Sequence, residues 1–156
     1  MKQSIFLLFA LFLFSYSALG QNKSQKAAKY AADLICDCVN TTYNGISEDI
    51  RIVLKQMMSA PKEEQLKFVQ NLDQTTRLKL IEESSILNQK EKQIEFQQCR
   101  EEMEQRMKSK FPLYAGKTDQ DEALIQLMMV HLDKKKECQF TLFLMKLGMQ
   151  NKGKQG

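Results

Sequence analysis

The sequence predicts an all-α fold, a single-domain bundle of five or six helices held together by two disulfide bonds. Glycine and proline are scarce, with six and two copies in 156 residues, and neither occurs between Pro61 and Pro112. Many short strands would need more of these turn-forming residues. The same stretch is rich in Gln, Glu, Lys, Leu and Met, which favour helices. The four cysteines are an even number, as two disulfides require.

The first 20 residues have the pattern of a secretory signal peptide. Lys2 precedes an apolar run over residues 5–14, and small residues lead to Gln21, where we expect the mature chain to begin. Ten apolar residues are too few to cross a hydrocarbon layer about 30 Å thick, so we expect no transmembrane anchor and a secreted or periplasmic location. The predicted organisation is a signal peptide at 1–20, a helical domain at 21–149 and a flexible basic tail at 150–156.

Caps and apolar spacing predict four helices in the first half of the mature chain. The first covers about residues 24–40 and ends in a polar turn. Ser47 is expected to cap the second, since two acidic residues follow it. Pro61 suits the first position of a short third helix, and Asp73 is expected to cap the fourth. The apolar residues of these helices are Ile46, Ile50, Val53, Leu54, Met57 and Met58 in the second, Leu66, Val69 and Leu72, expected to face inward, in the third, and Leu78 and Ile81 in the fourth.

Two long helices are predicted in the second half. The first covers about residues 86–110, and Ser84-Ser85 leaves open whether the preceding helix ends there or continues into it. After a loop, Thr118 and the acidic residues that follow it in the chain indicate the start of the last helix. This helix is expected to run to about Leu147 and to end at Gly148.

The cysteines Cys36, Cys38, Cys99 and Cys138 constrain how these helices pack. In an exported chain we expect them to form two disulfides. Cys36 and Cys38 lie about 200° apart around a helix, so a bond between them would require the helix to unwind. Cys99 and Cys138 each lie on the apolar face of a long helix. We therefore expect the first helix to lie between the two long ones, with one cysteine bonded to each. Both pairings remain open.

The last helix carries apolar residues on two sides. One side includes Leu124, Cys138 and Leu142. The second is the line Ile125, Met129, Leu132, Phe140, Phe143 and Leu147. A helix that is apolar on two sides is either central in the bundle or covered by a partner. Phe140, Phe143 and Leu147 are therefore the candidate interaction surface, for a protein partner or for self-association.

Residues that could support metal binding or catalysis are few. His131 is the single histidine, and a soft-metal site for Cu(I) would combine it with reduced Cys36 and Cys38. Export favours oxidised cysteines, so we expect no metal and no cofactor. The adjacent pairs Glu82-Glu83 and Glu101-Glu102 diverge by about 100° on a helix, and no serine lies in a nucleophile turn. The sequence therefore predicts no catalytic residues and no enzyme.

The charge pattern also limits the class of partner. The formal net charge of +4 falls to +3 when Lys2 leaves with the signal peptide, and the basic residues gather after Asp133. Such charge runs usually keep a surface solvated. No aromatic residues alternate with these lysines, so we expect no nucleic-acid partner. The sequence favours an exported, non-enzymatic interaction or structural protein. The alternative is a helical carrier whose Met- and Phe-rich faces enclose a lipid or another apolar ligand.

Overall fold

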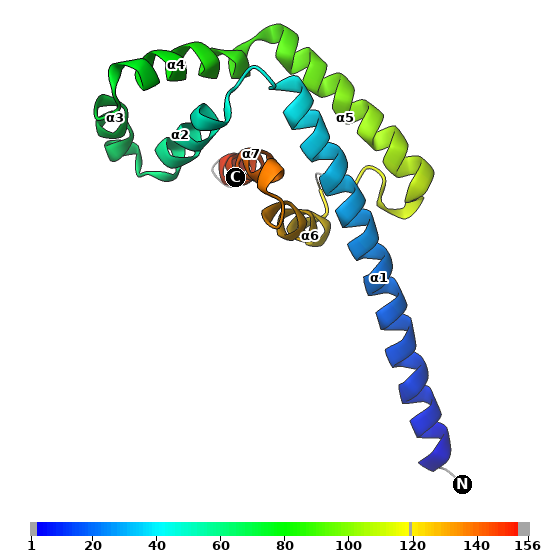
Figure 1. Ribbon diagram of the computed structural model, residues 1–156. Coiled ribbons are helices and arrows are strands. Elements are labelled where there is room, and N and C mark those ends of the chain that lie inside the picture. The colour runs from blue at the N-terminus through cyan, green and yellow to red at the C-terminus, as the bar shows by residue number, and fades with distance from the viewer. Residues whose placement is uncertain (1–2, 119, 153–156) are drawn as a thin grey trace.

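The computed structural model describes residues 3–118 and 120–152, and the side chains of residues 22–118 and 120–149. It confirms the all-α fold, and the described residues contain no strand (Figure 1). Seven α-helices occur in this part of the chain: α1 (Gln3–Thr42), α2 (Glu48–Ser59), α3 (Lys62–Gln70), α4 (Gln74–Ser84), α5 (Lys90–Lys110), α6 (Glu122–Asp133) and α7 (Gln139–Lys152). Three short 3-10 helices join them: η1 (Ser85–Asn88), η2 (Pro112–Tyr114) and η3 (Lys136–Cys138).

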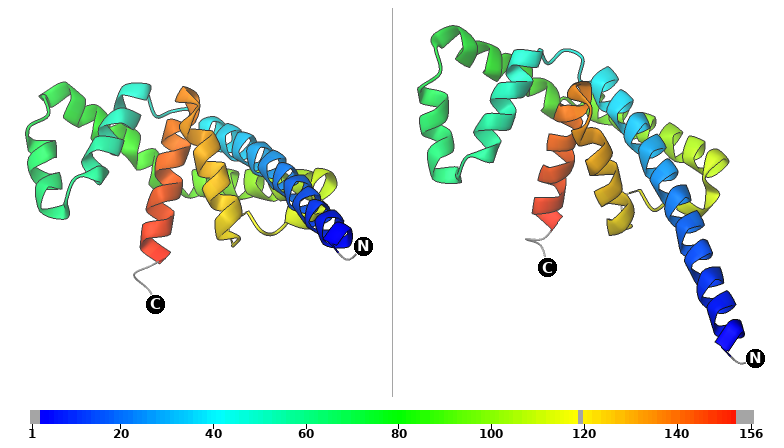
Figure 2. Two further views of the ribbon diagram at one scale, coloured as in Figure 1. Left: turned by 90° about the horizontal axis from the view of Figure 1, so that it is seen from below. Right: turned by 60° about the horizontal axis from the view of Figure 1, so that its bottom comes forward.

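Helix α1 starts at Gln3 rather than near residue 24, so it runs through the segment predicted as a signal peptide. Figures 1 and 2 show this first part extending beyond all other helices. The first buried side chain described on α1 is that of Ala27. The signal peptide at 1–20 stays a prediction, and its first two residues lie outside the described residues, as do residues 153–156 of the expected tail.

The helix starts follow local hydrogen bonding, with corrections at three predicted positions. Ser47 stands at the N-cap position of α2, but its side chain makes no capping hydrogen bond. Pro61 stands at the N-cap position of α3 rather than at its first helical position. Asp73 caps α4, as expected, and its Oδ1 accepts from the backbone N–H of Thr76 at 2.9 Å. The cap of α6 is Asp121 rather than Thr118, because the Asp121 carboxylate accepts from the N–H of Leu124 at 3.1 Å. The Thr118 hydroxyl instead donates to Glu104 on α5.

The larger core cluster surrounds the second half of α1. Four alanines on α1 are buried: Ala27, Ala28, Ala31 and Ala32. Their small side chains let α5 and α6 approach α1 closely from two sides. Methionine and leucine side chains complete the cluster: Met103 and Met107 on α5, and Leu124, Met128 and Leu132 on α6. Helix α1 therefore lies between α5 and α6, as expected of the first helix, although α6 is only the first part of the second predicted long helix.

The second core cluster lies between the end of α1, α2, α4 and α7. Its buried members are Val39, Tyr43, Ile46, Ile50, Leu54, Leu80, Phe140 and Phe143. α2 lies against α7 through this cluster, whereas α3 buries no residue and α4 buries only Leu80. Helices α2, α3 and α4 form one end of the molecule, on the opposite side of α7 from α6 (Figure 2).

The single long C-terminal helix expected from the sequence is wrong, because the chain breaks after Asp133. Lys135 is extended, at φ −113° and ψ 118°, and η3 leads into α7. No glycine or proline marks this break. Contacts with α1 at Lys135 and Cys138 override the helix propensity of the lysines. The expected stop at Gly148 is also wrong, since α7 continues to Lys152. The break explains why seven helices occur instead of five or six.

The choice left open at Ser84-Ser85 is settled by η1. α4 ends at Ser84, the 3-10 turn follows at once, and α5 begins at Lys90 rather than near residue 86. The Ser85 hydroxyl donates to the carbonyl of Glu82 at 2.6 Å. Such bonds from serine to its own helix compete with continued α-helix.

Candidate functional site

The two disulfides form where α1 meets the second half of the chain. Cys36 is bonded to Cys138 in η3, with Cα atoms 5.4 Å apart, and Cys38 is bonded to Cys99 on α5, with Cα atoms 5.8 Å apart. The two bonds leave α1 on opposite sides, as the 200° separation predicted. Each cysteine of α1 is bonded to a different partner segment, and the structure now supplies the pairing.

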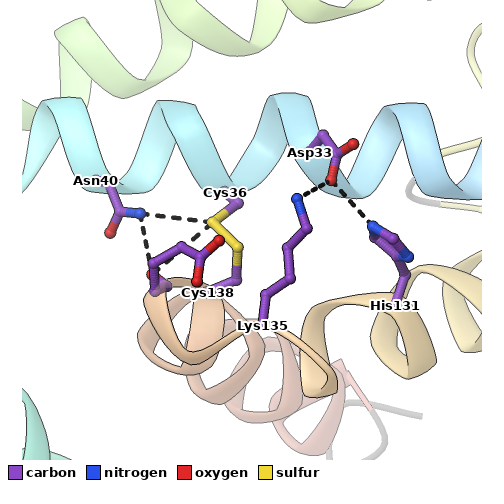
Figure 3. Close-up of polar contacts among 7 residues, drawn as sticks. Asp33, Cys36, Asn40, His131, Lys135 and Cys138 are labelled. Atoms are coloured by element: carbon purple, nitrogen blue, oxygen red, sulfur yellow. Dashed lines mark hydrogen bonds and ion pairs between the residues drawn. A yellow bond between two sulfur atoms is a disulfide. The ribbon is translucent and has the colours of Figure 1, made fainter.

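A small charged cluster lies beside the Cys36–Cys138 bond (Figure 3). Asp33 on α1 points toward the α6–η3 turn, where its Oδ1 accepts from Lys135 Nζ at 2.8 Å. The same oxygen lies 3.0 Å from His131 Nε2. All three side chains are partly exposed, with 20% to 35% of their surface accessible. The cluster therefore fixes the end of α6 against α1 without burying a charge.

The protonation of this cluster follows from its contacts. Partial burial raises the pKa of Asp33. The hydrogen bonds with Lys135 and His131 and the charges of these two residues together lower the pKa by more than burial raises it, so the net shift is downward from the ordinary value of 3.8. The pKa of Lys135 is raised, first by its hydrogen bond to Asp33. The carboxylate and the ammonium group thus stabilise each other's charged form.

A second polar contact lies on the other side of the same disulfide. Asn40 Nδ2 donates to the carbonyl oxygen of Glu137 at 3.0 Å and contacts Cys36 Sγ at 3.5 Å (Figure 3). The Asn40 side-chain oxygen accepts from Arg51 on α2 at 2.7 Å. Polar contacts therefore flank the disulfide on both sides, and one of them leads directly to α2.

Arg51 joins α1, α2 and α7 at one point. Its Nη2 donates to the carbonyl of Tyr43 at 2.8 Å, and its Nε donates to the carbonyl of Ile46 at 3.0 Å. Its guanidinium lies 4.9 Å from the ring centre of Phe140, a cation–π contact. Sequence reasoning missed this residue, because a single arginine on an amphipathic helix carries no signal of the carbonyls it will meet.

The cysteines beside these clusters are not available as metal ligands. All four cysteines are in disulfides, so Cys36 and Cys38 offer no thiolate to a metal beside His131. Nowhere among the described side chains do three His, Cys, Asp or Glu residues gather closely enough to hold a metal ion. One carboxylate from each adjacent glutamate pair named in the sequence analysis is hydrogen-bonded: Glu83 accepts from Ser47, and Glu101 accepts from Gln97. The contacts of these carboxylates are with the chain itself.

The three residues predicted as an interaction surface lie mainly inside the chain. Phe140 and Phe143 are only 5% and 7% exposed, packed in the second core cluster with ring centres 6.1 Å apart. Leu147 is half-buried against the same cluster. Of the two explanations for an apolar helix on two sides, the structure places α7 centrally, because α2 covers the line that the sequence left open. These rings do not form an exposed surface.

Among the described residues, five of the eight large exposed apolar side chains lie instead on the segment of residues 48–84, here called the arm, which comprises α2, α3 and α4. Leu66 on α3 is 67% exposed, and Leu78 and Ile81 on α4 are 61% and 63% exposed. The expectation that Leu66 faces inward is wrong, because no helix covers the outer side of α3. Val69 and Leu72, from the same predicted set, do pack partly against the second core cluster.

The arm is attached to the rest of the molecule without a disulfide. Ser47 donates from its N–H and its hydroxyl to the Glu83 carboxylate, at 2.6 and 2.7 Å, which holds the start of α2 to α4. Arg77 Nη2 donates to the carbonyls of Gln70 and Leu72, at 2.8 and 2.9 Å, which holds the end of α3 to α4. These polar contacts therefore add to the apolar packing of the second core cluster in fixing how the three helices lie relative to one another.

The described residues include no helix with both the length and the apolar character that crossing a membrane requires. Comparisons with protein-family models, with curated proteins and with solved structures find no match to this chain.

Proposed function

We propose that this chain is an exported, non-enzymatic interaction protein that presents the arm to a protein partner. The exposed side chains of Leu66, Leu78 and Ile81 carry this proposal. Single exposed apolar residues are common on protein surfaces. Here, however, three lie on two consecutive short helices that together bury only one side chain. Most of the surface of these three side chains is not buried within the chain, and a partner that covers them would bury it.

Export is supported by the signal-peptide pattern at residues 1–20 and by the two disulfides. Disulfides persist in oxidising compartments such as the periplasm or the extracellular space. They tie the second half of α1 to α5 and to η3, and Arg51 connects this disulfide-linked part to α2 at the start of the arm. A rigid support lowers the entropy cost of ordering a binding surface on association.

Crosslinking from the arm, followed by binding with purified components, tests this proposal. A photoreactive residue at Leu66 is expected to crosslink one protein in the native compartment, whereas the same residue at Leu113, which is 73% exposed on η2, is not. The purified partner should then bind the parent protein and lose affinity with Leu66→Asp but not with Leu113→Asp. Equal binding by both variants would refute the arm as the interaction surface.

The alternative function, a carrier of a lipid or another apolar ligand, stays a prediction from the Met- and Phe-rich helices. It differs from the interaction proposal in one measurable property, the presence of an apolar molecule bound to the purified protein. A carrier retains such a molecule in a native mass spectrum, whereas an interaction protein shows none.

A further inference from the structure

The exposed face of α4 carries a short heptad pattern. Gln74, Leu78 and Ile81 follow one another at spacings of four and three residues, and Ser85, the first residue of η1, follows after four more. This spacing places the three α4 residues on one narrow stripe of the helix. The two apolar members are more than 60% exposed. On the opposite side of α4, Leu80 is 5% exposed and packs into the second core cluster. The stripe therefore faces away from its own chain.

The residues beside this stripe carry opposite charges. Arg77 precedes the first apolar position, on one side of the stripe, and Glu82 follows the second, on the other side. In a parallel pair of helices, residues at these two positions lie opposite each other on different chains, five residues apart in number. A second copy would thus bring its Glu82 to Arg77, and symmetry would repeat the contact.

An antiparallel pair would not use these charges. There, each side of the stripe faces the same side of the other copy, so that Arg77 would lie near Ser84 and Glu82 near Thr75. The charge pattern therefore favours the parallel arrangement.

We infer that the arm's partner is a second copy of this chain, paired in parallel through Leu78 and Ile81 of α4, with Arg77 of each copy facing Glu82 of the other. This inference rests on the proposed function and names the occupant of the same surface. Two apolar side chains per copy are few compared with a permanent dimer interface. The pairing is therefore weak, and the protein dimerises reversibly as its concentration rises.

Sedimentation equilibrium of the oxidised, mature protein tests the pairing. We expect a monomer–dimer equilibrium below about 1 mM. The double variant Leu78→Asp/Ile81→Asp should raise the dissociation constant more than about tenfold, with an unchanged thermal melt, because both side chains are exposed. Ile52→Asp, at a 48% exposed position of α2, is the matched control and should leave the equilibrium unchanged.

Cysteine crosslinking tests the parallel geometry. In a symmetric parallel pair the two copies of Leu78 face each other, so Leu78→Cys should form a covalent dimer under mild oxidation. Lys79→Cys, about 100° away around the helix, should not. A dimer insensitive to Leu78→Asp/Ile81→Asp, or equal crosslinking of both cysteine variants, would overturn the inference. A protein that stays monomeric at about 1 mM would also overturn it, while the binding test at Leu66 would still decide the proposed function.

Discussion

Replacing Arg51 by methionine tests how the arm is held to the rest of the molecule. Methionine keeps most of the side chain's length but removes three hydrogen bonds, to Asn40, Tyr43 and Ile46. Each such bond contributes about 1 kcal/mol. The contact with Phe140 adds about 0.5 kcal/mol. Because Arg51 is half-buried and water can replace part of these interactions, we expect a net loss of about 3 kcal/mol in the free energy of unfolding.

Urea unfolding of the oxidised protein, followed by circular dichroism, measures this loss. In a separate thermal scan, a change of about 3 kcal/mol should lower the melting temperature by about 10 °C in a domain of this size. Lys55→Met is the matched control on the same helix, since Lys55 is exposed and makes a single contact at 3.4 Å. We expect it to change stability by less than about 0.5 kcal/mol. If Arg51→Met costs less than about 1 kcal/mol, Arg51 does not hold the arm.

Three further predictions concern the disulfides, the charged cluster and the loop before α6. Replacing both cysteines of either disulfide by serine should cost about 4 kcal/mol in chain entropy, because the bonds join residues separated by 102 and 61 positions and each shortens the loop that the other closes; chemical denaturation with the remaining bond intact measures both. Asp33→Asn should cost about 1 kcal/mol at pH 7. Because the folded-state pKa of Asp33 is lowered, its contribution is present above the unfolded pKa and is lost as the pH falls through the folded value. In pH-dependent unfolding, the variant and the parent should therefore begin to converge below the unfolded pKa of about 4 and become equal below the folded pKa. Glu104→Gln should destabilise the loop by about 1 kcal/mol, since its carboxylate accepts from the N–H of Gly116 at 2.8 Å, and hydrogen exchange of that N–H should accelerate.

The fold class and the position of α1 could be predicted because they depend on local composition and on helix geometry. Two cysteines separated by one residue project to opposite sides of a helix, which leaves a central helix as the simple solution. The sequence could not show which partner each cysteine takes, since Cys99 and Cys138 both lie on apolar faces. The buried alanines beginning at Ala27 were a further signal of close helix packing that the sequence reasoning did not use.

The break between α6 and α7 could not be predicted because its cause is tertiary. Lysines favour helix, and the chain leaves the helix at Lys135 only where Asp33 and Cys36 on α1 hold the turn. The same limit applies to Phe140. Its apolar line was recognised from its spacing, but only the folded position of α2 shows that this line is covered within the chain.

The exposed arm could not be recognised from the sequence for a related reason. Leu66, Leu78 and Ile81 have the spacing of ordinary core residues, and a short helix gives no sign of whether another helix will cover it. The heptad on α4 is visible in the sequence, but it acquires meaning only when Leu80, two positions from Leu78, is seen to face the core.

A native mass spectrum of the protein exported into an oxidising compartment tests the central claim, that this is an exported interaction protein without a bound ligand. We expect a chain that begins at Gln21, is lighter than its reduced form by four hydrogen atoms, carries no adduct and shows a dimer that grows with concentration. Free thiols, a bound metal ion or a bound lipid would contradict it, the last in favour of the carrier.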